Sequence, residues 1–181
     1  AQGLAPMRSF WASGGVRVSV GSLRPGTYHV RLVGDPTRSL WRPQWYDRAA
    51  TVDLSLPVVI PDDGSVVVID PVLERGGQIS GAAAIGGTAY CFVLITGVDA
   101  AIVTAYTRVR ADSPGFRWTG LAEGRYRIGL HWGETWPVSG GAPPAGTHWY
   151  PGVADWAAAA ELEIVDAGVI TDLELGPPPA R

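Results

Sequence analysis

Apolar and polar residues alternate along most of this chain with a period of two, the pattern of half-buried β-strands. Clusters of glycine, proline and aspartate separate the alternating segments, as in the turn Pro61-Asp62-Asp63-Gly64. Residues 157–165 fit either a short helix, from their alanine content, or a strand with Leu162 and Ile164 inward, and the first repeat favours the strand. The alternating segments and the short apolar runs between turns predict strands at 7–11, 16–20, 28–32, 49–58, 66–73, 78–81, 90–96, 101–108 and 169–175, and therefore an all-β chain.

The stretch 113–128 carries the most informative local pattern. Phe116 and Trp118 alternate with polar residues, the segment Leu121-Ala122-Glu123-Gly124 follows, and the alternation then resumes. We expect a β-hairpin whose turn places Gly124 at positive φ, because glycine adopts that conformation without steric cost. The same Leu-x-x-Gly-x-Tyr signature occurs at 23–28.

This signature belongs to an internal repeat whose members recur in order with an offset of 98 to 104 residues. The matching segments are Gly26-Thr27-Tyr28 with Gly124-Arg125-Tyr126, Trp45-Tyr46 with Trp149-Tyr150, and Val68-Ile69-Asp70 with Ile170-Thr171-Asp172. The repeat predicts two tandem Greek-key β-sandwich domains, immunoglobulin-like or transthyretin-like, at 1–75 and 76–181. The first is 31 residues shorter than the second (75 against 106), so we expect it to lack its initial strands, about two of them.

Composition narrows the class of protein. Hydrophobic residues make up 46% of the chain and charged residues 17%, which favours a packed globular chain. The net charge is −3 and no run of arginines occurs, so nucleic acid is not an expected partner. No apolar run approaches the ~20 residues that span a bilayer.

Several motifs follow one another in an order that resembles a known family. They are Gly76-Gly77-Gln78-Ile79-Ser80-Gly81, Val103-Thr104-Ala105-Tyr106, Gly115-Phe116, Leu121-Ala122-Glu123-Gly124-Arg125-Tyr126 and Trp149-Tyr150. Together they resemble the carboxypeptidase regulatory-like domain, a transthyretin-like β-sandwich found in tandem in bacterial surface and secreted proteins. The resemblance implies a spacer, adhesion module or regulatory appendage without a catalytic site, located outside the cell or at its surface. The start Ala1-Gln2-Gly3 fits a chain from which a leader or a larger N-terminal part is removed.

Candidate chemistry is sparse, and no cofactor is expected. Cys91 is the only cysteine, so no intramolecular disulfide forms, and its apolar neighbours indicate a buried strand thiol. His131, Glu134 and His148 are weak candidates for a metal site, because histidine and glutamate bind zinc but no recognised ligand spacing is present. The acidic turn residues, such as Asp155, are more simply turn formers than calcium ligands.

Six of the eight tryptophans divide into repeated and non-repeated positions. Trp45 and Trp149 recur and are interpreted as structural. Trp41, Trp132, Trp136 and Trp156 have no visible repeat partner, so we regard them as candidate ligand-binding residues that could form an aromatic platform, with burial under their own loops as the alternative.

Three functional hypotheses follow. The favoured one is a non-enzymatic extracellular structural or assembly module of a larger surface or secreted bacterial protein, completed by β-strand addition from a protein partner, a neighbouring copy or a precursor segment. The alternative is a carbohydrate-binding module that holds a glycan with its loop tryptophans. The third is an enzyme that uses the His131, Glu134 and His148 cluster.

Overall fold

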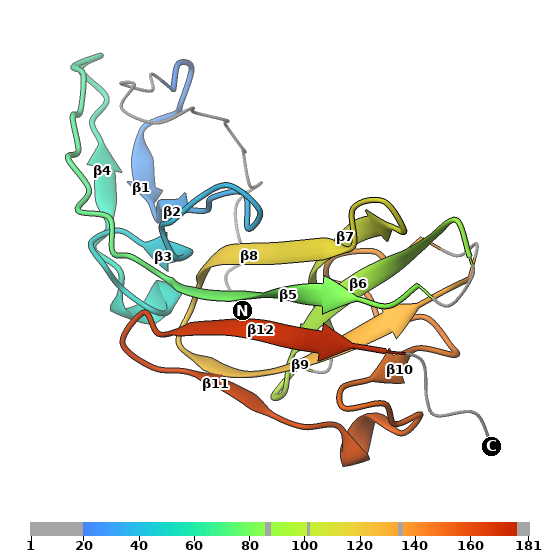
Figure 1. The fold of residues 1–181 in the computed structure, drawn as a ribbon. Coiled ribbons are helices and arrows are strands. Elements are labelled where there is room, and N and C mark those ends of the chain that lie inside the picture. Colours follow the sequence, from blue (N-terminus) through green and yellow to red (C-terminus); the bar gives the residue numbers. More distant parts are fainter. Residues whose placement is uncertain (1–19, 86–87, 101, 134–135, 177–181) are drawn as a thin grey trace.

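The computed structural model describes residues 20–85, 88–100, 102–133 and 136–176, and these residues form an all-β chain (Figure 1). No α-helix occurs among them; two 3-10 turns, η1 and η2, are the only helical segments. The elements are β1 (Gly26–Tyr28), β2 (Arg31–Leu32), β3 (Gln44–Trp45), η1 (Val52–Leu54), β4 (Val58–Ile60), β5 (Gly77–Ala83), β6 (Tyr90–Gly97), β7 (Val103–Arg110), β8 (Gly115–Leu121), β9 (Gly124–His131), β10 (His148–Trp149), η2 (Trp156–Ala158), β11 (Leu162–Ile164) and β12 (Val169–Leu175).

The second half of the chain, from β5 onward, contains two sheets that face each other, an arrangement consistent with a β-sandwich (Figure 1). One has five strands in the order β10-β9-β6-β7, with β11 also paired to β9; the other has the order β12-β5-β8. Val93, Ile95, Ile79 and Trp118 are fully buried between the sheets. Each such side chain contributes about 1.5–3 kcal/mol to folding, so the core of the molecule lies in this half.

The strand β6 lies at the centre of this half and is buried on both of its faces. Its inward residues Cys91, Val93 and Ile95 belong to the main core, whereas Leu94 on the opposite face packs in a second cluster with Trp149. A run buried on both faces loses its polar positions, which explains why 90–96 is nearly all apolar.

The hairpin expected at 113–128 is wrong, because its two strands lie in different sheets. β8 pairs with β5, and β9 pairs with β6. The turn therefore crosses from one sheet to the other, and the strands on both sides of it point apolar residues into the same core, Trp118 from one sheet and Ile128 from the other. Alternation is the same in both arrangements, so the sequence pattern does not distinguish a hairpin from a crossing.

The crossing turn has the backbone conformation that the sequence predicted. Gly124 has a φ of 144° and its repeat partner Gly26 a φ of 153°. In the second half the hydroxyl of Tyr126 donates a hydrogen bond to the carbonyl oxygen of Ala122 at 2.8 Å, which closes the turn. Tyr28 makes the equivalent bond in the first half, also at 2.8 Å.

Among its described residues, 20–75, the first half contains only two-stranded sheets, β1 with β4 and β2 with β3. The strand expected at 49–58 is wrong over most of its length, because the 3-10 turn Val52–Leu54 interrupts it and β4 begins at Val58. No strand forms at 66–73 either. This segment corresponds to β12, which pairs with β5, and the first half has no counterpart of β5 among the described residues. The strands expected at 7–11 and over most of 16–20 lie outside the described residues.

The two halves share the same strand-pairing registers. Gly26, Thr27 and Tyr28 pair with Ile60, Val59 and Val58, just as Gly124, Arg125 and Tyr126 pair with Ile164, Glu163 and Leu162. Arg31 and Leu32 pair with Trp45 and Gln44, as Gly129 and Leu130 pair with Trp149 and His148. The first half thus repeats β9, β10, η2 and β11 as β1–β2, β3, η1 and β4, residue by residue.

The β2–β3 loop joins the two halves. The amide of Thr119 in β8 donates to the carbonyl oxygen of Pro36 at 2.7 Å, and the amide of Gly76 donates to that of Leu40 at 2.9 Å. These bonds cover the end of β8, which would otherwise be an open sheet edge.

Candidate functional site

The internal repeat separates scaffold residues from candidates for function, because a side chain that the fold requires should recur at the equivalent position. Trp45 and Trp149 pass this test. The amide of Trp149 donates to the carbonyl oxygen of Val153 at 2.7 Å, and that of Trp45 to the carbonyl oxygen of Ala49 at 2.8 Å. Trp149 is only 3% exposed and Trp45 is half-buried, and the backbone of each closes a tight loop through this bond.

The four non-repeated tryptophans do not form one platform. No ring contact joins any two of them within the part of the chain that the structure describes. Trp136 is 55% exposed, and the centre of its ring lies 4.9 Å from that of Phe92 on β6. The guanidinium carbon of the exposed Arg108 lies 5.9 Å from the centre of the Trp136 ring. Trp132 is half-buried and contacts the ring of His148 edge-on at 5.4 Å. These two tryptophans therefore lie against different strands of the five-stranded sheet.

The remaining two tryptophans lie elsewhere. Trp41 is 43% exposed in the β2–β3 loop, where its backbone forms a bridge with Arg75. Trp156, in η2, lies under the guanidinium group of Arg127 at 4.0 Å. Its repeat equivalent is Val52, so the scaffold itself does not require an aromatic ring there.

A groove of about 340 Å³ opens beside Trp156. Pro143, Pro144 and Thr147 line one part, and Asp155 and Trp156 another. This volume lies within the usual range for small-molecule sites, and a ring with a carboxylate beside it is a combination that can hold a polyhydroxylated ligand.

Charged groups behind the groove hold η2 in place. Arg127 is buried and donates hydrogen bonds to the carbonyl oxygen of Trp156 at 2.8 Å and to the carboxylate of Glu161 at 2.7 Å. The carboxylate of Asp155 accepts a bond from the amide of Ala157 at 2.9 Å and caps the turn. The groove wall is therefore fixed by paired charges and does not depend on a ligand for its shape.

The proposed histidine cluster is only partly covered by the structure. His131 is 5% exposed at the end of β9, and His148 lies on the neighbouring strand β10, opposite Leu130. Glu134 lies outside the described residues. Among those described, no group of three or more histidine, cysteine, aspartate or glutamate side chains could hold a metal ion.

Cys91 lies where the sequence indicated, on β6 and fully buried. Burial raises the pKa of its thiol to about 11 from an ordinary value of 9.0. A thiol that stays protonated is a poor nucleophile, so this residue has the properties of a core side chain.

The most unusual surface lies in the first half. Ala49 and Val58 are its only buried hydrophobic residues within the described range, and both belong to the repeated β3–β4 segment. Its exposed large hydrophobic side chains are Val20, Val33, Leu40, Trp41, Leu54, Leu56, Val59, Val66, Val67, Val68, Val72 and Leu73. Sequence reasoning predicted missing strands here but did not predict which side chains they would leave in contact with water.

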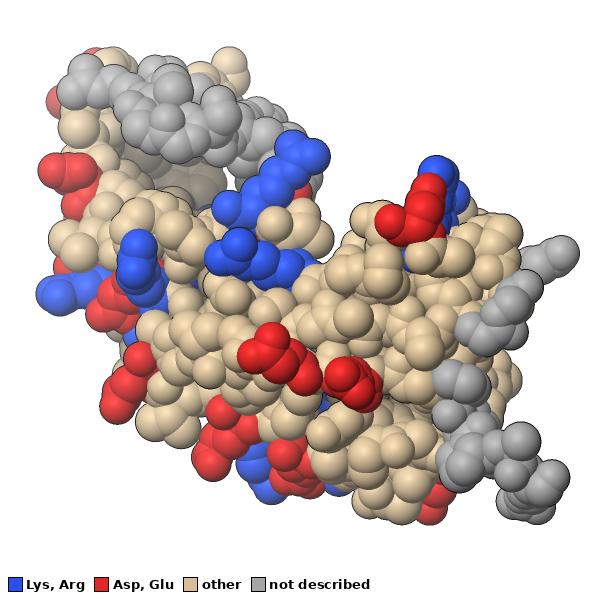
Figure 2. Space-filling model, viewed as in Figure 1, with Lys and Arg blue, Asp and Glu red and all other residues tan. Residues whose placement is uncertain are grey.

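No family model, curated protein or solved structure matches this chain. No helix among the described residues is long and apolar enough to cross a membrane. Acidic and basic side chains are interspersed on the face shown in Figure 2, as on an ordinary protein surface.

Proposed function

We propose that the chain is a non-enzymatic structural module of a larger surface or secreted bacterial protein, and that it assembles with another polypeptide through its first half. In this proposal, residues 1–75 and 76–181 are tandem Greek-key β-sandwich units of the carboxypeptidase regulatory-like type. The first unit lacks its initial strands, and a partner completes it. No residue is assigned a catalytic role.

The observation that carries the proposal is the contrast between equivalent residues of the two halves. Tyr126 is 7% exposed and Ile128 is fully buried, whereas their counterparts Tyr28 and Val30 are only half-buried. The same local fold therefore has a covered core in one half and an uncovered one in the other. Apolar surface left in water costs roughly 25 cal/mol per Å², and contiguous patches of it usually mark binding surfaces.

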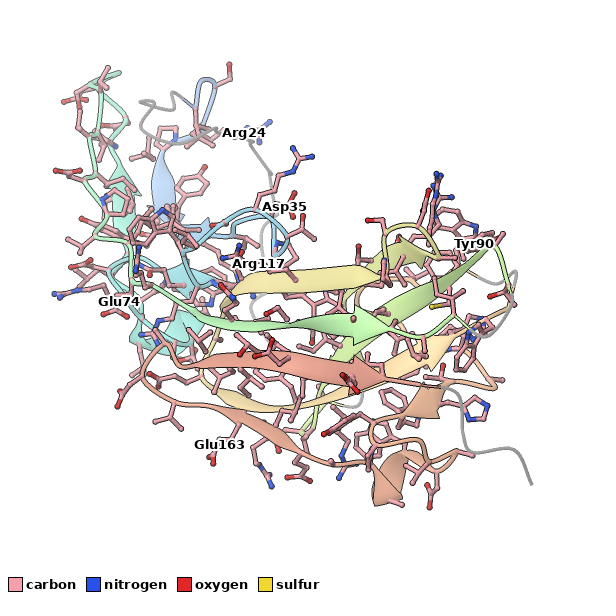
Figure 3. The ribbon with its side chains drawn as sticks, in the orientation of Figure 1. Arg24, Asp35, Glu74, Tyr90, Arg117 and Glu163 are labelled. Carbon is pink, nitrogen blue, oxygen red and sulfur yellow. The ribbon has the colours of Figure 1, made fainter. Side chains whose placement is uncertain are left out.

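The sheets of the first half support the same conclusion. Two-stranded sheets are marginally stable alone in water and gain stability by pairing with further strands or by packing. The two here are β1–β4 and β2–β3. They are anchored to the second half by the β2–β3 loop, where Arg42 forms ion pairs with Glu74 and, at 3.8 Å, with Glu123 of the second half. Figure 3 shows Glu74 beside the chain that leads into β5, close to this junction.

Sedimentation velocity of the purified chain over a range of concentrations tests the assembly function. We expect concentration-dependent association, or binding to a partner, through the first half. Val59 is 60% exposed on β4, and its repeat equivalent is Glu163, so Val59→Glu gives the first half the residue that the second half already has. This variant should weaken association, and the control Val169→Glu, at an equally exposed site in the second half, should not.

A monomer at all concentrations, with both halves equally protected from hydrogen exchange, would contradict the assembly function. Such a result would show that the first half is closed by residues of its own chain.

A second function, carbohydrate binding, is favoured by one observation: the groove beside Trp156 has an aromatic wall and a carboxylate at a position where the repeat requires neither. A glycan array with the wild-type chain and Trp156→Ala tests it. Binding that Trp156→Ala abolishes would place the glycan in the groove. Binding lost only in the double variant Trp132→Ala and Trp136→Ala would place it at those tryptophans and not in the groove.

A further inference from the structure

The second half contains a template for the strand that the first half lacks. On one side β9 pairs with β10 and β11, and on the other it pairs with β6 in antiparallel register. The facing pairs are Phe92 with His131, Val93 with Leu130, Leu94 with Gly129, Ile95 with Ile128, Thr96 with Arg127 and Gly97 with Tyr126. Each residue of this β9 segment has an equivalent 98 positions earlier, in the segment 28–33.

The segment 28–33 uses only one of its two edges among the described strands. β1 pairs with β4 and β2 with β3, which are the equivalents of β11 and β10. The amide of Tyr46 donates to the carbonyl oxygen of Val30 at 2.9 Å on this same side, as the amide of Tyr150 does to that of Ile128. No described strand occupies the position of β6. An unpaired edge of this kind binds an added strand through its main-chain N–H and C=O groups.

Burial along the segment matches a missing neighbour on that edge. Leu130 is 2% exposed, whereas its counterpart Leu32 is half-buried. Val33, at the end of the segment, is 59% exposed although its counterpart His131 is 5% exposed. A strand in the β6 position would cover these side chains, as Val93 and its neighbours do in the second half.

The side chains on the outer face of residues 28–33 indicate which charge a partner strand should carry. A Cβ atom at Gly129 would lie 2.6 Å from the side chain of Thr147, so this position of β9 has room only for glycine. The first half has Arg31 instead, with its guanidinium group 5.8 Å from the centre of the Trp45 ring. In the part of the chain that the structure describes, Arg31 forms no ion pair.

The neighbouring outward position differs in the same way. Arg127 of β9 is neutralised by Glu161, whose repeat equivalent is Pro57. The counterpart of Arg127 is His29, which bonds to the hydroxyl of Ser55 and has no acidic partner among the described residues. The edge thus has apolar residues on its inner face and, on its outer face, His29 and Arg31 beside the exposed Val33.

We propose that the edge formed by residues 28–33 accepts an antiparallel β-strand from another polypeptide, in the register of β6 against β9. The donor has apolar residues opposite Val30 and Leu32 and an acidic residue opposite Arg31. The inference rests on the proposed assembly function and adds to it the site, the direction and the chemistry of the partner strand.

Disulfide trapping tests the register. The donor probes are peptides with the sequence of Tyr90–Gly97, in which valine replaces Cys91 and glutamate replaces Leu94 to face Arg31. One carries cysteine at the Phe92 position and the other at the Thr96 position. The protein variants are Val33→Cys and His29→Cys, both at exposed positions. The native Cys91 is fully buried and needs no replacement.

The expected result is a diagonal pattern. Val33→Cys should cross-link to the peptide with cysteine at the Phe92 position, and His29→Cys to the one with cysteine at the Thr96 position, each at least about tenfold faster than the mismatched pair. Cross-strand charge pairs contribute about 0.2–1 kcal/mol, so glutamate opposite Arg31 should bind about 1.4- to 5-fold more tightly than glutamine. Arg31→Gln should remove that advantage.

Cross-linking at equal rates in all four combinations, or none in any, would overturn the proposed register. A chain that shows either result but still associates in a manner sensitive to Val59→Glu would overturn the register alone and leave the assembly function standing.

Discussion

The substitution Gly120→Ala tests most sharply how the two halves of the chain are joined. Gly120 ends the regular part of β8 with a φ of 66°, and a Cβ atom there would lie 2.5 Å from the carbonyl oxygen of Trp41 and 2.7 Å from that of Ser39. Both are backbone atoms of the β2–β3 loop. The loop would have to move away from β8 to admit a methyl group.

The size of the effect has two parts. A left-handed backbone conformation costs a non-glycine residue about 1–2 kcal/mol. Overpacking against backbone adds typically 1–3 kcal/mol. Gly146 provides a matched control, since its φ is 78° and a Cβ atom there would have nothing within 4 Å. Gly146→Ala should therefore lower the free energy of unfolding by the first part alone, and Gly120→Ala by both.

Urea unfolding followed by tryptophan fluorescence measures the two free energies, and hydrogen exchange at the Thr119 amide reports the loop itself. The Thr119 amide donates to the carbonyl oxygen of Pro36, so it should exchange faster in Gly120→Ala than in the wild-type chain. Its exchange rate should be unchanged in Gly146→Ala. Equal destabilisation by the two substitutions, with Thr119 unaffected, would refute the packing of the β2–β3 loop on β8.

Three further predictions concern the second half and its repeat partner. Tyr126→Phe should lower the free energy of unfolding by about 0.5–1.5 kcal/mol through its lost hydrogen bond, and Tyr28→Phe by less, because Tyr28 makes the same bond in a more exposed place; urea unfolding compares them. Gly124→Val should cost about 1 kcal/mol or more by strain at positive φ, visible as a lower melting temperature, whereas an unchanged value would count against that strain. Burial raises the pKa of the Cys91 thiol to about 11 from 9.0. Between these two values the thiol ionises in the unfolded state but stays neutral in the folded state. The free energy of unfolding should therefore fall as the pH rises from about 9 to about 11. Cys91→Ala should flatten that slope in pH-dependent urea unfolding, and an unaltered slope would show that another group causes it.

The sequence pattern predicted most of the second half and less of the first. The strand expected at 169–175 forms with those bounds, and those expected at 90–96 and 101–108 form within two residues. The pattern failed at 66–73, where apolar residues are present but a partner strand is not. Apolar positions indicate which side chains could face a core, whereas a strand also needs a neighbour to bond with.

Candidate sites were less predictable than strands. Trp149 is buried and Trp136 is exposed, but the repeated Trp45 is half-buried, as are the non-repeated Trp132 and Trp156, so the repeat alone does not predict exposure. It gave no sign of the groove beside Trp156, because that groove depends on how two loops approach each other. For the edge of residues 28–33, the sequence predicted only that the first half lacks strands. The register proposed for a strand at this edge could not be predicted, because it is taken from the pairing of β6 with β9.

Hydrogen exchange of equivalent backbone segments tests the central claim most directly. The segments 28–33 and 126–131 have the same pairing to one side and differ in whether a described strand lies on the other. The account predicts that 28–33 exchanges much faster than 126–131 in the chain alone. It also predicts that the glutamate-containing donor peptide slows exchange in 28–33 and leaves 126–131 unchanged. Equal protection of the two segments in the chain alone would contradict the claim that the first half presents a free edge.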